Sequence, residues 1–110
     1  MSNLLRVFGE RDAAARRSAI ADTYCDDVVF SDPEGDVVGH AAIDAKVEAL
    51  LAASPGLEFH AVEPLYESDG RAVLAWALGP PGAEAVVRGV DVMTLRDGRI
   101  ATLRTMLAAG

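Results

Sequence analysis

The stretch Val29–Gly35, with the sequence VFSDPEG, ends an apolar run with an acid that stands directly before a proline turn. This acid, Asp32, would be held by rigid backbone beside apolar side chains. A general base needs a fixed position and a dry neighbourhood that can raise its pKa. A second acid, Asp91, interrupts the apolar run Gly89–Met93, although acids are depleted in the middle of strands. We therefore expect both carboxylates to line one pocket that moves protons on an apolar substrate.

Length and composition limit the classes of protein that the chain can belong to. Its 110 residues fit a single domain, 1–110, and 51% hydrophobic residues are enough for a core. The net charge of −7 would repel phosphate backbones and anionic membrane surfaces, so we expect neither nucleic acid nor a membrane as partner. Cys25 is the single cysteine, and no Cys/His cluster has metal-ligand spacing. Without a signal peptide or a long apolar span, a cytoplasmic location is expected.

The order of the predicted elements indicates an α+β fold. Helices are expected over residues 3–8, 12–24 and 39–53, with short strands at 28–30 and 36–38. Four longer strands are expected over residues 57–66, 72–78, 85–95 and 99–107, joined by turns at 69–70, 80–82 and 97–98. Helices would then gather on one face of a curved antiparallel sheet, and the cone between them would hold an apolar pocket.

Alternation along the predicted strand 85–95 sorts its side chains between two faces. Asp91 shares its face with Val87, Gly89, Met93 and Leu95, and this face is assigned to the pocket because Arg88 points the other way. The opposite, outer face of the sheet still carries apolar residues, which are Val86, Val90, Val92, Ile100 and Met106. An apolar outer face is usually covered, so we expect a homodimer in which a second copy of the chain packs there.

Four pieces of the chain together resemble one known superfamily. They are residues 24–27 (YCDD), 32–35 (DPEG), 38–43 (VGHAAI) and 90–100 (VDVMTLRDGRI). They resemble the nuclear transport factor 2-like superfamily, and within it the ketosteroid isomerases and the SnoaL-like polyketide cyclases. The resemblance covers nearly the whole chain. It implies an α+β cone in which N-terminal helices pack on a curved antiparallel sheet around an apolar pocket.

The resemblance also implies roles for the two acids. Asp32 would be the general base that takes a proton next to a carbonyl, and Asp91 would stay protonated and donate a hydrogen bond to the enolate oxygen. Ketosteroid isomerase is a known case of an acid kept neutral by an apolar site. The isomerases use a tyrosine of the first helix as a further donor, whereas residues 3–8 here (NLLRVF) contain none. The residues that would line the substrate pocket are Tyr24, Phe30, Leu50, Phe59, Trp76 and Met93.

Several functions remain open at this point. The first is an isomerase that shifts a double bond in a small apolar ketone, and the second is a polyketide cyclase that closes a ring by aldol attack. The others are a non-catalytic binder of small hydrophobic ligands and an assembly domain that pairs through its outer sheet face. The resemblance implies neither a metal nor an organic cofactor.

Overall fold

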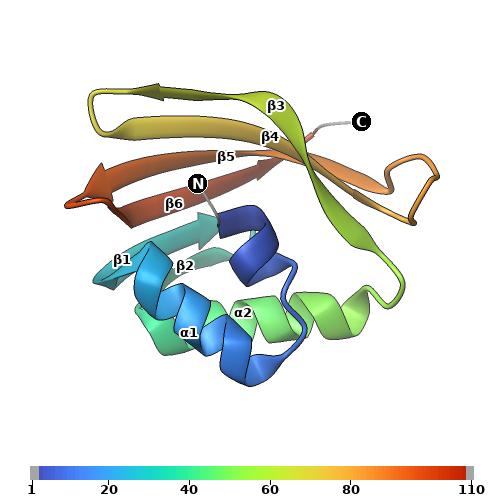
Figure 1. Ribbon diagram of the computed structural model, residues 1–110, viewed down its shortest axis with the longest axis horizontal. Coiled ribbons are helices and arrows are strands. Elements are labelled where there is room, and N and C mark those ends of the chain that lie inside the picture. The colour runs from blue at the N-terminus through green and yellow to red at the C-terminus, as the bar shows by residue number, and fades with distance from the viewer. Residues whose placement is uncertain (1–2, 109–110) are drawn as a thin grey trace.

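The computed structural model describes residues 3–108 and has an α+β fold (Figure 1). Its elements follow the chain in the order η1 (Asn3–Phe8), α1 (Ala13–Thr23), β1 (Tyr24–Asp32), β2 (Gly35–Val38), α2 (His40–Ala53), β3 (Glu58–Ser68), β4 (Arg71–Gly79), β5 (Val87–Arg96) and β6 (Arg99–Leu107). The strands form one sheet in the order β2-β1-β6-β5-β4-β3. The predicted meander of four long antiparallel strands is confirmed, but β1 pairs with β6 in parallel.

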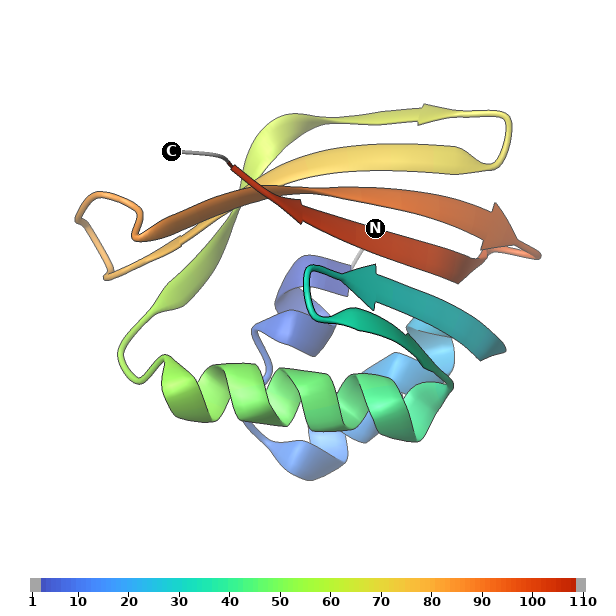
Figure 2. The same cartoon turned by 180° about the vertical axis from the view of Figure 1, so that it is seen from behind.

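The helices all lie on one side of the curved sheet (Figures 1 and 2). Apolar side chains of α1 and α2, such as Ile20, Ile43 and Val47, pack in one core with Phe30 and Leu103 from the strands. All five of these side chains are buried, so their removal from water is the main term that holds the two layers together. Figure 2 shows α2 running along the layer beneath β1 and β2.

The first long helix begins where the sequence predicts and ends one residue early. Asp12 caps α1, and its carboxylate accepts a hydrogen bond from the backbone N–H of Ala15 at 2.8 Å. Tyr24 was expected to end this helix, but its backbone is extended and it begins β1, opposite Ile100 of β6. The change of backbone conformation at Tyr24 places its ring in the core.

An irregularity in β6 determines which of its residues face the core. Arg96 pairs with Arg99, but Thr94 pairs with Thr102, so Ala101 is an extra residue in the β5–β6 ladder. The bulge turns both Ile100 and Leu103 inward, and both are buried. The expectation that Ile100 lies on the outer face is therefore wrong.

The outer face of the sheet carries an apolar row across four strands. Val62, Ala75, Val90 and Met106 lie in register on β3 to β6, and Val62 and Met106 are 50% and 47% exposed. Val86, which was assigned to this face, precedes β5 instead and borders a cavity on the other side of the sheet. The homodimer through the outer face stays a prediction.

Gly89 leaves room on the sheet for the indole of the single tryptophan. It pairs with Trp76 of β4, and a Cβ atom at Gly89 would lie 2.4 Å from Cζ2 of the indole. The same Cβ would lie 2.7 Å from the backbone oxygen of Met106. These contacts are too short for any side chain, so the indole position depends on glycine at this position.

We expect Gly89→Ala to destabilise the protein by about 1–3 kcal/mol, because the added methyl group must displace the indole or the backbone of β6. Urea denaturation would measure the loss. Gly82→Ala is the matched control, since its φ is +71° but its Cβ would meet open space, so only backbone strain is added. A Gly89→Ala variant that is as stable as the wild type would contradict the packing of Trp76 on Gly89.

Candidate active site

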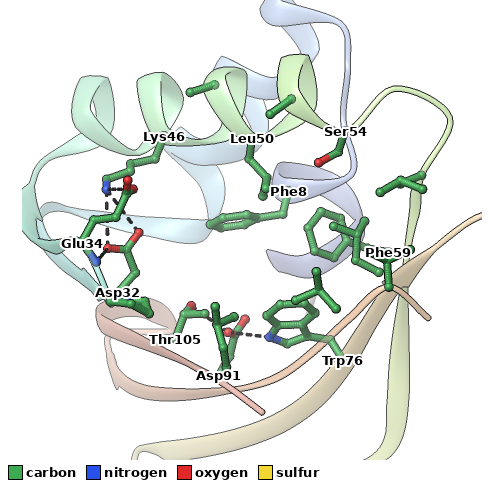
Figure 3. Close-up of a pocket in the computed structure, with 18 of the residues that line it drawn as sticks. Phe8, Asp32, Glu34, Lys46, Leu50, Ser54, Phe59, Trp76, Asp91 and Thr105 are labelled. Carbon is green, nitrogen blue, oxygen red and sulfur yellow. Dashed lines mark hydrogen bonds and ion pairs between the residues drawn. The ribbon is translucent and has the colours of Figure 1, made fainter. Parts of the chain in front are cut away.

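A cavity of about 620 Å³ lies between the helices and the concave face of the sheet (Figure 3). Small-molecule sites typically have volumes of roughly 300–1,000 Å³. Most of its lining residues are apolar, and the lining consists of Phe8, Phe30, Asp32, Pro33, Glu34, Lys46, Ala49, Leu50, Ala53, Ser54, Leu57, Phe59, Trp76, Leu78, Val86, Val87, Asp91, Thr105 and Leu107. The cavity thus brings together two acids that are 59 positions apart in the sequence, Asp32 and Asp91.

Asp91 projects from the inner face of β5 and is only 4% exposed. Its Oδ1 atom accepts two hydrogen bonds, from the indole N–H of Trp76 and from the hydroxyl of Thr105, both at 2.9 Å. Burial raises the pKa of Asp91, while the hydrogen bonds from Thr105 and Trp76 act in the opposite direction. The net effect is a raised pKa, which favours a protonated carboxyl more than in water.

Asp32 ends β1 at the other side of the cavity, and its side chain is 15% exposed. One carboxylate oxygen, Oδ1, accepts the backbone N–H of Glu34 at 2.9 Å, which closes the turn across Pro33. The other, Oδ2, lies 3.2 Å from the ammonium of Lys46. Asp32 therefore borders a cation as well as the apolar side chains that the sequence predicted.

Lys46 belongs to α2 and bridges two acids of the cavity rim. Its Nζ atom lies 2.9 Å from Oε1 of Glu34 and 3.2 Å from Oδ2 of Asp32 (Figure 3). The hydrogen bond to Glu34 raises the pKa of Lys46, partial desolvation lowers it by less, and the hydrogen bond to Asp32 adds a smaller increase. The ammonium is therefore charged at neutral pH. The Lys46 side chain extends from the helical layer to the turn after β1.

Aromatic rings form one wall of the cavity. Phe8 and Phe59 lie edge to face at 6.3 Å between ring centroids, and Phe59 and Trp76 do so at 5.5 Å. Of the predicted ligand-contacting residues, Phe30, Leu50, Phe59 and Trp76 do line the cavity. Their contact with a substrate stays a prediction.

Two predicted ligand-contacting residues, Tyr24 and Met93, are not among the residues that line the cavity. Both are fully buried in the core, because the helices cover that end of the sheet. The Tyr24 hydroxyl has no hydrogen-bond partner among the described residues. Burial raises its pKa well above the usual value, and the charge of nearby Asp91 raises it further. Tyr24 therefore lies behind the site and not on its surface.

Sequence reasoning missed Lys46 and Thr105. Lys46, Ala49, Leu50 and Ala53 follow the helical spacing i, i+3, i+4, i+7, and all four line the cavity. That spacing was a usable signal for Lys46. Thr105 lies opposite Asp91 only because of the bulge at Ala101, since a regular hairpin would place Arg104 there. No local sequence pattern predicts this shift.

Within residues 3–108, no group of three or more His, Cys, Asp or Glu side chains could hold a metal ion. Among the helices that the structure describes, none is long and apolar enough to cross a membrane. The polar groups that line the cavity are mainly carboxyl, ammonium and hydroxyl groups.

The chain belongs to the family of SnoaL-like domains, because the model of that family matches residues 2–103. No curated protein matches the chain. Among solved structures, it is similar to a presumed isomerase of the SnoaL-like family from Agrobacterium tumefaciens. The two are 25% identical with a TM-score of 0.89 over 98% of this chain and 92% of that one.

Two further solved structures show the fold alone. A presumed SnoaL-like polyketide cyclase from Jannaschia is 23% identical, with a TM-score of 0.75 over 96% of this chain and 83% of that chain. A presumed ketosteroid isomerase from Kribbella flavida is 14% identical, with a TM-score of 0.72 over 99% of this chain and 74% of that chain. The nuclear transport factor 2-like fold is thereby confirmed.

The raised pKa of Asp91 predicts a stability change with pH. The folded chain holds this proton more tightly than the unfolded chain. The stabilisation is complete below the ordinary carboxyl pKa of 3.8 and is lost as pH rises through the folded-state pKa. Asp91→Asn removes this titration. We therefore expect its free energy of unfolding, measured in urea, to gain on the wild type as pH rises through that window.

Asp36→Asn is the control for this experiment, because it removes one carboxylate from an exposed position on β2. The difference in free energy of unfolding between Asp36→Asn and the wild type should not show the pH dependence expected for Asp91→Asn. A difference between Asp91→Asn and the wild type that stays constant at every pH would contradict the raised pKa.

Proposed function

We propose that the protein is an acid–base enzyme that transfers a proton next to the carbonyl group of a small apolar ketone. One observation carries this proposal: an enclosed carboxyl with a raised pKa, Asp91, and a more accessible carboxylate, Asp32, line the same apolar cavity. An enclosed acid with a raised pKa is suited to donate a hydrogen bond, and a more accessible carboxylate is suited to accept a proton.

In the proposed reaction, the substrate carbonyl oxygen accepts a hydrogen bond from protonated Asp91. Asp32 takes a proton from the carbon between the carbonyl group and a β,γ double bond, and the electron pair left behind is delocalised onto the oxygen as a dienolate. Asp32 then returns the proton to the γ carbon, so the double bond moves into conjugation with the carbonyl group and no atom is gained or lost. The hydrogen bond from Asp91 strengthens as the oxygen gains charge, which lowers the barrier.

A cyclase would use the same first step. The enolate carbon would attack a second carbonyl group of the same molecule, forming a carbon–carbon bond, and the resulting alkoxide would take up the proton. The cavity volume of about 620 Å³ leaves room for a fused-ring or a folded chain substrate. The charges of Asp32, Glu34 and Lys46 leave this end of the cavity with a net negative charge, which disfavours an anionic substrate.

The second candidate function is a non-catalytic binder of small apolar molecules. Two observations favour it: η1 has the sequence NLLRVF, without a tyrosine donor, and Lys46 already occupies one oxygen of Asp32. Loss of one donor to the enolate oxygen typically lowers the rate by about 10²–10³. Binding with little turnover would then be expected.

A β,γ-unsaturated ketosteroid tests the proposal, because its isomerisation produces a conjugated enone with a new absorbance. We expect the wild type to generate this absorbance and Asp32→Asn to lower the rate by at least about 10²-fold, since the amide cannot accept the proton. Asp36→Asn should keep the wild-type rate. Binding of an equilenin-like phenol without turnover would favour the binder. If the protein neither binds the phenol nor isomerises the ketosteroid, both functions are refuted.

Lys46 gives a separate prediction about the base. We expect Lys46→Met to lower kcat by about tenfold with little change in KM for a neutral ketone, because the Asp32 carboxylate loses the partner that orients it. Lys46→Arg keeps a cation and should retain most of the rate. Steady-state kinetics with circular dichroism as the folding control would measure this. An unchanged kcat in Lys46→Met would show that the ion pair between Lys46 and Asp32 does not contribute to the reaction.

A further inference from the structure

The two hydrogen bonds to Asp91 end on the same oxygen. Trp76 on β4 and Thr105 on β6 both donate to Oδ1 at 2.9 Å, from the two strands that flank β5. A carboxyl oxygen has about two lone-pair positions, so Oδ1 has none left for a proton. An indole N–H can only donate, which means that Oδ1 is an acceptor whether Asp91 is charged or neutral.

The other oxygen, Oδ2, has no hydrogen-bond partner among residues 3–108. It is also absent from the set of polar side-chain atoms that are both fully buried and without a partner, so Oδ2 is partly exposed. Asp91 lines the cavity, and Figure 3 shows its carboxyl group between Trp76 and Thr105, facing the space below α2. Oδ2 is therefore accessible from the cavity. A proton on Asp91 belongs on this oxygen, from which it can be donated only to a molecule in the cavity.

We propose that Trp76 and Thr105 are positioning residues that saturate Oδ1 of Asp91 and so direct an Oδ2–H donor into the cavity, toward a carbonyl oxygen of the ligand. This inference rests on the proposed function, because it assumes that protonated Asp91 is the donor. It adds to that function the two residues that decide which oxygen carries the proton. It also requires an acceptor oxygen in the ligand.

The surroundings hold both donors in place. The Trp76 indole lies against Gly89, where no side chain could fit, and packs edge to face on Phe59. Thr105 lies directly opposite Asp91 in the β5–β6 ladder. Rotation of the Asp91 carboxyl would break both hydrogen bonds at once, so its orientation is set before a ligand arrives.

The arrangement predicts that asparagine can replace the neutral acid. In Asp91→Asn, the amide oxygen would accept from Trp76 and Thr105, and the NH₂ group would point into the cavity as the donor. In Asp91→Leu, a side chain of similar size offers no donor. This matched pair separates the directed hydrogen bond from the filling of space.

The first experiment uses the single tryptophan of the chain, whose indole gives one ¹H–¹⁵N NMR signal. We expect this signal in the wild type to titrate with Asp91 and to lose its pH dependence in Asp91→Asn. Thr105→Val should move the titration to higher pH, because the lost hydrogen bond favoured the charged form, and Thr105→Ser should restore it. A merely structural threonine would not produce this shift and rescue.

The second experiment uses Prodan, a neutral naphthyl ketone whose emission shifts to the red when its carbonyl accepts a hydrogen bond. At a pH below the indole titration, we expect red-shifted emission from Prodan bound to the wild type and to Asp91→Asn. Prodan bound to Asp91→Leu should show blue-shifted emission. The emission wavelength of Prodan bound to Trp76→Phe or to Thr105→Val should lie between those of the wild type and Asp91→Leu.

These results are independent of turnover. If the ketosteroid is not isomerised but both experiments succeed, the proposed enzyme is wrong and the directed donor stands, as in a binder. Identical emission from Asp91→Asn and Asp91→Leu, or an Asp91 titration that neither Thr105 variant changes, would overturn the inference even if the enzyme is active.

Discussion

The burial of one carboxyl group, that of Asp91, is the constraint on which the rest of this site depends. An acid on the inner face of a sheet is costly unless it is hydrogen-bonded or neutral. Here it receives two donors, from Trp76 and Thr105, and its raised pKa makes the neutral form more accessible. The two hydrogen bonds offset the cost of burying the carboxyl group, and because both end on Oδ1, the other oxygen is left facing the cavity. Gly89 belongs to the same arrangement, because it makes room for the indole that donates.

The two aspartates that line the cavity differ in how each is anchored. Asp91 is held by the sheet, in an environment with little solvent, whereas Asp32 lies at a strand end where a turn and the α2 lysine meet. The ammonium of Lys46 links the helical layer to this turn, so the position of Asp32 depends on the packing of α2 as much as on β1. Unequal surroundings are what give two identical functional groups different chemistry.

Membership of the SnoaL-like family defines the fold and leaves the reaction to the site. In this chain a cavity lies between the helices and the curved sheet, and the chemistry it can support depends on the side chains that line it. In this chain the reactive groups are few and lie in an otherwise apolar lining. The ligand proposed above, which is mostly hydrocarbon and carries a carbonyl oxygen at one point, rests on that combination.

Much of the fold could be predicted from local pattern. Alternating residues, Asp-Gly turns and the Asp12 cap depend on neighbours in the chain, so they indicated the four long strands and the helix starts. The inward direction of Asp91 followed from the same alternation. Tyr24 and Met93 were predicted to contact the ligand, and both lie in the buried core and not among the residues that line the cavity. Periodicity tells which face is buried and does not distinguish a cavity wall from a filled core.

By itself, the sequence determined the α+β order of elements, the two acids and the apolar character of their surroundings, because each of these is encoded within a few adjacent residues. Only the tertiary structure decided the partners of those acids. Thr105 meets Asp91 through a bulge that shifts the β5–β6 register, and Lys46 meets Asp32 through the packing of α2 against β1. Such contacts join distant segments, and their geometry is set by how whole layers pack.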